Sequence, residues 1–223
     1  MTKALSWDEF MDAFADKFRG PVATIAALHA ERYLGSTHDL ALHLGKPVLD
    51  IGSGRGEWLK VLKQTQIPAQ GIELNERQVE RCVEQGLDVI HGDALRVMES
   101  TAEHTYSVIS AIQVVEHWPP EMVFDALKLM HRLLDHQGLL ILETVNVASL
   151  WAWNHFAYDP THLTPWPPKL LQFMAEKAGF SRVGVQYYSP IPLQFQLPVQ
   201  SGGWEHVSQW LYGPQDYAVW ARP

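Results

Sequence analysis

The sequence has 223 residues, a single cysteine (Cys82) and a formal net charge of −8 at pH 7. This length suits one folded domain, and the negative charge argues against nonspecific binding to nucleic acid phosphates. A lone cysteine cannot form an internal disulfide, which is typical of the cytoplasm, where we expect the protein. No apolar run in the sequence approaches the ~20 residues that a membrane-spanning helix needs.

The first 45 residues predict a helical cap. Phe10, Phe14 and Phe18 recur every four positions, which is typical of one face of a helix. Gly20-Pro21 interrupts this pattern, and Gly35-Ser36-Thr37 is expected to close the next one. Three helical segments are therefore expected, over residues 7–19, over 21–34 and over a short stretch that ends at residue 44.

After the cap, apolar strands alternate with amphipathic helices. The expected strands are 47–51, 69–73, 87–91, 106–112, 138–143, 182–188 and 216–221, and the expected helices are 56–65, 75–85, 120–134 and 167–179. Such alternation predicts an α/β fold in which a mostly parallel sheet has helices on both faces. We expect residues 1–223 to form one domain, with a cap over 1–45, a core over 46–223 and an insertion at about 145–168.

The most informative segment is the turn after the first strand, V-L-D-I-G-S-G-R-G-E-W-L at residues 48–59. Gly52, Gly54 and Gly56 permit a tight turn and let a ligand approach the backbone. Their spacing is not the G-x-G-x-x-G of dinucleotide sites, and a phosphate-binding P-loop pattern is absent from the sequence. Asp50 would repel a pyrophosphate but attract a cation. This pattern favours S-adenosylmethionine (SAM), which carries a sulfonium and an ammonium and no phosphate.

Two further acids follow successive strands. Glu73 lies at the end of the second strand, where an acid can accept hydrogen bonds from both ribose hydroxyls. The glycine segment resembles that of class I SAM-dependent methyltransferases. By this resemblance, Asp93 and Ala94 after the third strand are expected at the position that binds the adenine amino group. The alternative interpretations are a solvent-facing acid for Glu73 and a simple Gly-Asp turn for Asp93.

The segment after the fourth strand, Q-V-V-E-H-W-P-P at residues 113–120, is where a methyl group and its acceptor should meet. His117 is the best candidate base, because an imidazole titrates near neutral pH. It could instead pack on the cofactor or pair with Glu116. His155, Asp159 and His162 are close in sequence, but Pro160 and Pro165 argue against a helix that would align them. We therefore expect no metal ion.

The acceptor is expected to lie near an aromatic-rich segment. Trp151, Trp153 and Trp166 are interpreted either as core packing or as a surface that stacks on a sugar ring.

Several motifs together resemble the bacterial methyltransferases that modify O-antigen and capsular glycan chains. The resemblance runs from about residue 10 to 221. Its motifs are F-R-G at 18–20, G-R-G-E-W-L at 54–59, E-T-V-N at 143–146, D-P-T-H at 159–162, P-W-P-P at 165–168, A-G-F at 178–180 and Y-G-P-Q-D-Y-A at 212–218. Val145 stands where the family usually has Pro, and Ser53 where it often has Cys. The bulky Trp151–Trp153 segment also departs from the family pattern, which has small residues there.

The resemblance implies a Rossmann-like class I fold with a seven-stranded sheet, and O-methylation of a sugar hydroxyl or sugar-linked phosphate by SAM. It also implies that Arg19 pairs with the methionine carboxylate; the alternative is an arginine at a helix C-terminus that is stabilised by the helix macrodipole. The expected catalytic residues are Glu116, His117, Asp159 and His162. The expected cofactor-binding residues are Arg19, Asp50, Gly52, Ser53, Gly54, Gly56, Glu73, Leu74, Asp93, Ala94 and Gln113. The expected partner is a small-molecule or glycan acceptor. Two alternatives stay open, a methyltransferase for a small metabolite and a SAM-binding subunit without activity.

Overall fold

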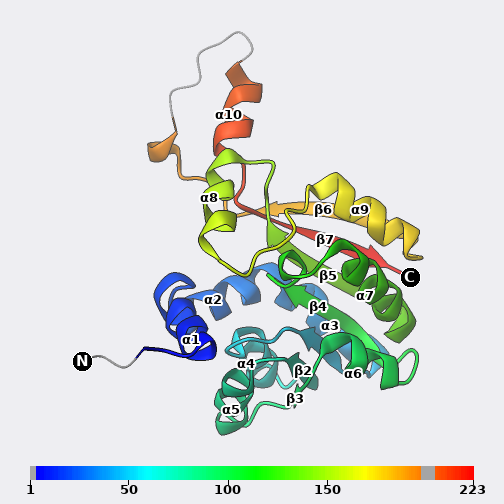
Figure 1. Cartoon of the computed structure of the whole chain (residues 1–223). Coiled ribbons are helices and arrows are strands. Elements are labelled where there is room, and N and C mark those ends of the chain that lie inside the picture. Colours follow the sequence, from blue (N-terminus) through cyan, green and yellow to red (C-terminus); the bar gives the residue numbers. More distant parts are fainter. Residues whose placement is uncertain (1–3, 197–203) are drawn as a thin grey trace.

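Seven strands form one sheet in the computed structural model, which describes residues 4–196 and 204–223 (Figure 1). The order across the sheet is β3-β2-β1-β4-β5-β7-β6. The strands β1 to β5 pair in parallel, and β7 runs antiparallel to both β5 and β6. The predicted α/β fold with a mostly parallel sheet is confirmed. The strands are β1 Val48–Ile51, β2 Ala69–Glu73, β3 Val89–His91, β4 Tyr106–Ile112, β5 Leu134–Val145, β6 Arg182–Tyr188 and β7 Asp216–Arg222.

Helices cover both faces of this sheet (Figure 1). The α-helices are α1 Trp7–Phe18, α2 Val22–His29, α3 Gly35–Leu44, α4 Glu57–Gln64, α5 Glu76–Glu84, α6 Ala94–Ser100, α7 Pro120–Leu133, α8 Leu150–Tyr158, α9 Pro168–Lys177 and α10 Trp204–Tyr212. A π-helical turn, η1 Ala30–Leu34, joins α2 to α3, and two short 3₁₀ turns are η2 Val115–His117 and η3 Leu193–Phe195. No helix among the described residues is long and apolar enough to span a membrane.

Two apolar cores lie on opposite sides of the sheet. One contains Met98 of α6, Leu127 of α7 and Leu171 of α9, packed against the strands. The other contains Tyr33 of η1 and Trp58 of α4, together with the thiol of Cys82 from α5. Residues of β1 and β4 contribute to both cores. This double burial is the physical reason why the strands read as almost continuous apolar runs.

The N-terminal cap differs from its predicted form. Gly35 was expected to help close a helix, yet its φ is −56° and the chain stays helical through it into α3. Burial of the Tyr33 side chain holds this junction together, and tertiary packing outweighs the low helix propensity of glycine. The helix ends instead at Gly45, which takes the left-handed conformation with φ 62°.

Three helices, α6, α8 and α10, were not predicted as such. Each is short, and α8 is rich in aromatic residues whose spacing does not form a clear apolar stripe. Helix α8 ends at Tyr158, before Asp159 and Pro160, so His155 lies on the helix while Asp159 and His162 lie in the loop that follows. This outcome agrees with the expectation that no single helix aligns the three.

The topology determines where a ligand can bind. The chain leaves β1 toward β2 and β3, then returns to place β4 on the other side of β1. In sheets of this kind the loops at the carboxyl ends diverge at that point and leave a crevice. Helices α1 and α8 border the crevice, and the rings of Phe18 and Tyr158 stack between them with centroids 6.1 Å apart.

Candidate active site

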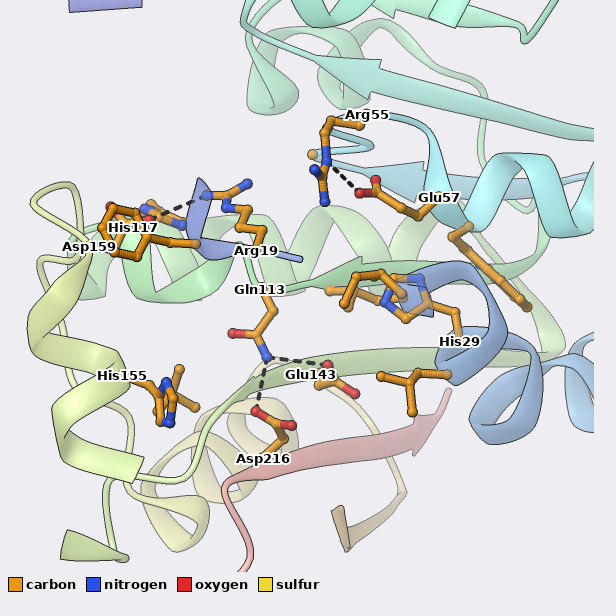
Figure 2. Close-up of a pocket in the computed structure, with 18 of the residues that line it drawn as sticks. Arg19, His29, Arg55, Glu57, Gln113, His117, Glu143, His155, Asp159 and Asp216 are labelled. Carbon is orange, nitrogen blue, oxygen red and sulfur yellow. Dashed lines mark hydrogen bonds and ion pairs between the residues drawn. The ribbon is translucent and has the colours of Figure 1, made fainter. Parts of the chain in front are cut away.

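A cavity of about 640 Å³ opens at the carboxyl ends of β1, β4 and β5 (Figure 2). This volume lies within the ~300–1,000 Å³ range of small-molecule sites. Its walls come from the cap, from the glycine loop after β1, from α8 and its following loop, and from the start of β7. The predicted site residues among its lining are Arg19, Asp50, Gly52, Ser53, Gly54, Gln113, His117, Asp159 and His162.

The glycine loop adopts the backbone that its sequence predicts. Gly52, Gly54 and Gly56 all have positive φ, at 66°, 51° and 76°. A Cβ on Gly52 would lie 2.6 Å from a methyl of Val114, whereas a Cβ on Gly54 would meet only the Gly52 carbonyl oxygen, at 4.0 Å. Gly52 is therefore required by packing inside the protein. Gly54 instead leaves an open space that a ligand can use.

Arg55 fastens this loop to the cap. Its Nε donates to Oε1 of Glu57 at 2.7 Å, and one terminal nitrogen donates to the Gly20 carbonyl at 3.0 Å. A second terminal nitrogen lies 3.7 Å from a carboxylate oxygen of Asp16 on α1. The guanidinium is buried. These contacts fix the position of the glycine loop relative to the end of α1 at the opening of the cavity.

Asp50 lies at the bottom of the loop and is 3% exposed. Its Oδ1 accepts a hydrogen bond from the Ser110 hydroxyl at 2.7 Å. Burial raises the pKa of this carboxyl to about 7, although the Ser110 bond opposes the shift. A carboxyl in this position has a strong electrostatic preference for a cationic ligand, because such a ligand would offset the penalty of burying its charge.

The other predicted cofactor residues lie outside the cavity lining. Glu73 ends β2 and accepts hydrogen bonds from the Gly54 and Asn75 backbone N–H groups, each at 2.8 Å. Asp93 caps the N-terminus of α6 by accepting from the Arg96 N–H at 3.1 Å. Leu74 is exposed, Ala94 packs on the core, and Gly56 lies against Leu87 and Cys82.

Arg19 connects the cap to the loop after α8. Its guanidinium lies 3.3 Å from Oδ2 of Asp159, and its side chain is 44% exposed while that of Asp159 is 7% exposed. Burial raises the pKa of Asp159, but the hydrogen bonds from the Thr161 hydroxyl and amide lower it more, and the net pKa is below its ordinary value. Asp159 is therefore an anion that anchors Arg19 beside the cavity.

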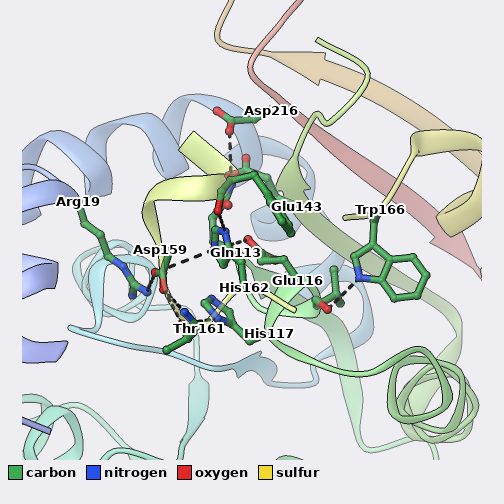
Figure 3. Close-up of polar contacts among 12 residues, drawn as sticks. Arg19, Gln113, Glu116, His117, Glu143, Asp159, Thr161, His162, Trp166 and Asp216 are labelled. Carbon is green, nitrogen blue, oxygen red and sulfur yellow. Dashed lines mark hydrogen bonds and ion pairs between the residues drawn. The ribbon is translucent and has the colours of Figure 1, made fainter. Parts of the chain in front are cut away.

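A chain of hydrogen bonds runs from Asp159 to His117 (Figure 3). The Thr161 hydroxyl lies 2.5 Å from Oδ1 of Asp159 and 2.8 Å from Nδ1 of His117. Because the Asp159 carboxylate can only accept, the hydroxyl donates to it and accepts from Nδ1–H of His117. Burial, together with the adjacent His162, lowers the pKa of His117 to about 4. The imidazole is consequently neutral, and its Nε2 carries the free lone pair.

His162 is held in the same tautomer. Its Nδ1 lies 2.7 Å from the carbonyl oxygen of Phe156, which can only accept, so Nδ1 carries the proton. Burial lowers the pKa of His162. The two imidazole rings lie with centroids 4.7 Å apart. Glu116 lies behind them, fully buried, and burial raises its pKa to about 8.

A polar group at the far end of the cavity was not anticipated from the sequence. Oε2 of Glu143, at the end of β5, accepts from Arg32 at 2.6 Å and from the Tyr33 hydroxyl. Asp216, at the start of β7, accepts from Gln113 at 3.4 Å. Burial and the charge of Glu143 raise the pKa of Asp216 to about 6. The polar residues at the strand ends could have indicated Glu143 and Asp216 from the sequence. Nothing in the sequence indicated Arg32, which lies in an otherwise apolar helical pattern.

Gln113 shares this region in an unusual conformation. Its φ is 57°, which is uncommon for a residue other than glycine. The backbone N–H donates to the Glu143 carbonyl at 2.8 Å, and the side-chain amide donates to Oε1 of Glu143 at 3.2 Å. This conformation turns the amide into the cavity (Figure 2). Backbone strain of this kind occurs often at functional sites.

The three tryptophans that the sequence singled out lie in two different environments. Trp166 is buried, its indole N–H donates to the Val115 carbonyl at 2.9 Å, and it belongs to the core. Trp151 and Trp153 are about 40% exposed on α8 and lie outside the cavity lining. The interpretation as core packing is confirmed for Trp166, whereas a stacking role for the exposed Trp151 and Trp153 stays a prediction. Tyr158 and Phe18 are the aromatic residues that border the cavity at this side.

Comparison with known proteins gives consistent matches. A family model described as a methyltransferase domain matches residues 26–184. The structure is similar to a SAM-dependent methyltransferase from Archaeoglobus fulgidus, with TM-score 0.87, 29% identity and coverage of 96% of this chain and 100% of that chain. Comparison with curated proteins gives no match.

Two further solved structures share the fold at lower identity. One, from Thermotoga maritima, is a SAM-dependent methyltransferase described as a possible histamine N-methyltransferase, with TM-score 0.65, 18% identity and coverage of 97% of each chain. The other is a complex of the Haloferax volcanii Trm112 methyltransferase activator with a methyltransferase, with TM-score 0.59, 15% identity and coverage of 97% of each chain. At these identities the likeness concerns the fold alone.

Proposed function

The chain is a class I methyltransferase domain whose methyl donor is S-adenosylmethionine, and from this premise we propose that it methylates an oxygen atom of a sugar, or of a phosphate carried by a sugar. The acceptor would belong to a bacterial surface glycan or its precursor, and the reaction would take place in the cytoplasm. The observation that supports an oxygen acceptor is the free Nε2 of His117. This residue lines a cavity that is bordered by hydrogen-bonding side chains.

The residues present fit the donor. The space over Gly54 admits a ligand against the backbone, and the Ser53 hydroxyl is buried without a hydrogen-bond partner among the described residues. Asp50 is the acid that suits the cationic methionine end. By resemblance, Glu73 would accept from the ribose hydroxyls, Asp93 from the adenine amino group, and Arg19 would pair with the methionine carboxylate. When bound, the donor supplies an electrophilic methyl group on sulfur.

The far end of the cavity suits a hydroxylated acceptor. Glu143 and Asp216 offer carboxylate oxygens, and Gln113 offers an amide, within one cavity. Groups of this kind can accept from and donate to the hydroxyls of a sugar. The glycan assignment itself rests on the sequence resemblance. The motifs that carry it, E-T-V-N at 143–146 and D-P-T-H at 159–162, contribute Glu143, Asp159 and His162 to the cavity lining.

The main contribution of the protein to the reaction is to align the acceptor with the methyl group. An acceptor oxygen held in line with the methyl carbon and sulfur gains rate from proximity, which can be worth ~7–11 kcal/mol. A hydroxyl acceptor must also lose its proton. Nε2 of His117 can take it, although burial lowers the pKa of this imidazole to about 4 and makes it a weaker base than the sequence suggested. The Thr161–Asp159 chain fixes the ring orientation, and the charge of Asp159 stabilises the imidazolium that forms. A phosphate acceptor is already an anion and needs no base.

Replacement of His117 by asparagine tests this role. The asparagine amide can keep the donation to Thr161, but it has no atom at the position of Nε2. With a hydroxyl acceptor we expect kcat to fall by ~10²–10⁴-fold, the usual contribution of a positioned base, and SAM affinity measured by calorimetry to stay unchanged. His136→Asn, on the exposed surface, is the matched control. An unchanged kcat with the true acceptor would reject the base role and favour a phosphate acceptor.

The acceptor class is tested in cells. Mass spectrometry of the surface polysaccharide, with and without the gene for this protein, should reveal the loss of one methyl group. The small-metabolite alternative predicts an unaltered glycan and the disappearance of a methylated small molecule. The alternative of a SAM-binding subunit without activity predicts no transfer from radiolabelled SAM to any acceptor in a single-turnover panel.

A further inference from the structure

Glu116, His117 and His162 form a cluster beside the cavity (Figure 3). One possible metal-binding atom of each residue lies within 4.8 Å of the others. Glu116 and His117 belong to the η2 turn after β4, whereas His162 lies in the loop after α8. The backbone N–H groups of Leu163 and Thr164 donate to the Glu116 carbonyl at 2.8 and 3.1 Å. These bonds fasten the two segments together, so the cluster is built by the fold.

Both imidazoles are oriented in the manner of metal ligands. The Nδ1–H of His162 donates to the Phe156 carbonyl, and the Nδ1–H of His117 donates to Thr161, which donates in turn to Asp159. Metal-binding histidines usually tie their second nitrogen to a carbonyl or a carboxylate in this way, which frees the other nitrogen for the metal. Here the free atom is Nε2 in both rings.

The third member of the cluster lacks a partner. The Glu116 side chain is fully buried, and neither of its carboxylate oxygens has a hydrogen-bond partner among residues 4–196 and 204–223. Its Oε1 lies 4.0 Å from Nε2 of His162. A buried carboxylate without a partner is costly. The raised pKa of Glu116 leaves a proton on this group near neutral pH, but Nε2 of His162 is too far away to accept a hydrogen bond from it. A cation could take the place of that proton and bind to the carboxylate and to both imidazole lone pairs.

We propose that Glu116, His117 and His162 bind one divalent transition-metal ion, of which zinc is the best match. Two imidazole nitrogens with one carboxylate oxygen suit Zn²⁺ or Fe²⁺ better than Mg²⁺, which prefers oxygen ligands. Metal bonds of ~2.1 Å require neighbouring ligand atoms about 3.4 Å apart, so the side chains must move together by roughly 1 Å. Arg19 does not oppose the ion, because Asp159 already neutralises its charge.

The position gives this ion a role that rests on the proposed function. His117 and His162 line the cavity, so an open coordination position would face the acceptor. A metal ion there would hold the acceptor oxygen and favour its ionised form. The ion would also bind the Nε2 lone pair of His117, which could then no longer accept a proton. His117 therefore acts as a base only in protein that has no metal bound. The binding test below uses neither SAM nor an acceptor, and its failure would leave the methyltransferase proposal intact.

The experiment is a titration of the whole chain, stripped with a chelator, with ZnCl₂ and separately with MgCl₂. A background variant, His104→Asn with His136→Asn, removes a second histidine pair, the partly buried His104 and the exposed His136, whose rings lie 4.0 Å apart. In this background we expect one Zn²⁺ per chain by calorimetry and elemental analysis, and no Mg²⁺ binding. Co²⁺ in place of Zn²⁺ should give visible absorption bands of a protein-bound ion.

Matched variants decide the site. Glu116→Gln keeps the shape and removes the charge, and His162→Asn keeps a donor for the Phe156 carbonyl and removes Nε2. Each should weaken Zn²⁺ binding by more than ~100-fold, since loss of an outer partner alone costs ~10–100-fold. Thr161→Val should show that smaller loss. His155→Asn, a cavity histidine outside the cluster, should bind Zn²⁺ as the background does. Absence of stoichiometric binding, or binding unaffected by both Glu116→Gln and His162→Asn, would overturn the proposal.

Discussion

Replacement of Gly54 by leucine should abolish SAM binding while the protein stays folded. In the protein without ligand, a Cβ at this position meets only the Gly52 carbonyl oxygen, at 4.0 Å, so the leucine side chain would extend into the cavity. The positive φ of 51° adds a backbone cost of ~1–2 kcal/mol. We expect the dissociation constant for SAM, measured by calorimetry, to rise at least ~100-fold, equivalent to ~2.7 kcal/mol.

Gly45→Leu is the matched control for this change. Gly45 has a similar φ of 62°, has no atom within 4 Å of its Cβ position, and lies at the end of α3 away from the cavity lining. Both variants should lose similar stability in urea, and only Gly54→Leu should lose the ligand. Gly52→Leu would not test ligand binding. Its Cβ would lie 2.6 Å from a methyl of Val114, and this clash would disturb the loop whether or not SAM binds there. Wild-type affinity in Gly54→Leu would show that SAM does not lie over this loop.

Asp50→Asn should flatten the pH dependence of stability and weaken SAM binding. The folded-state pKa of Asp50, about 7, is above the ordinary aspartate value, so between about pH 4 and 7 the folded protein binds more protons than the unfolded chain. Stability must therefore fall as pH rises through this window. At 1.36 kcal/mol per pKa unit the effect of this one group is at most ~4 kcal/mol. Urea unfolding of the wild type at pH 5 and pH 8, compared with Asp50→Asn, measures it.

The ionisation of Asp50 should also change when SAM binds. A sulfonium and an ammonium near Asp50 favour its ionised form, so SAM binding near pH 7 should release a proton. Calorimetry in buffers of different ionisation enthalpy detects this release, which Asp50→Asn should lack, together with a ~10–100-fold loss of affinity. Asp39→Asn, whose side chain is 86% exposed, is the control. Equal proton release in wild type and Asp50→Asn would place the cationic end of SAM elsewhere.

Much of the proposed cofactor half of the site could be predicted from the sequence, because its determinants are local. The glycine turn after a strand requires positive φ at given positions, and the structure has them at Gly52, Gly54 and Gly56. Alternating apolar strands and amphipathic helices predicted the sheet, with β2, β4 and β6 at their expected bounds. The roles of Glu73, Asp93 and Arg19 toward SAM stay predictions.

The proposed acceptor half of the site was decided by tertiary structure. Glu143 and Asp216 come from β5 and β7, which are far apart in sequence and neighbours only because β7 inserts antiparallel beside β5. Arg32 and the buried Tyr33 both donate to Glu143 from the π-helical turn η1, 111 and 110 residues earlier in the sequence. His162 meets Glu116 and His117 only through the backbone bonds of a loop after α8. Sequence periodicity reports burial along one segment, and it carries no information about which separate loops a fold brings together.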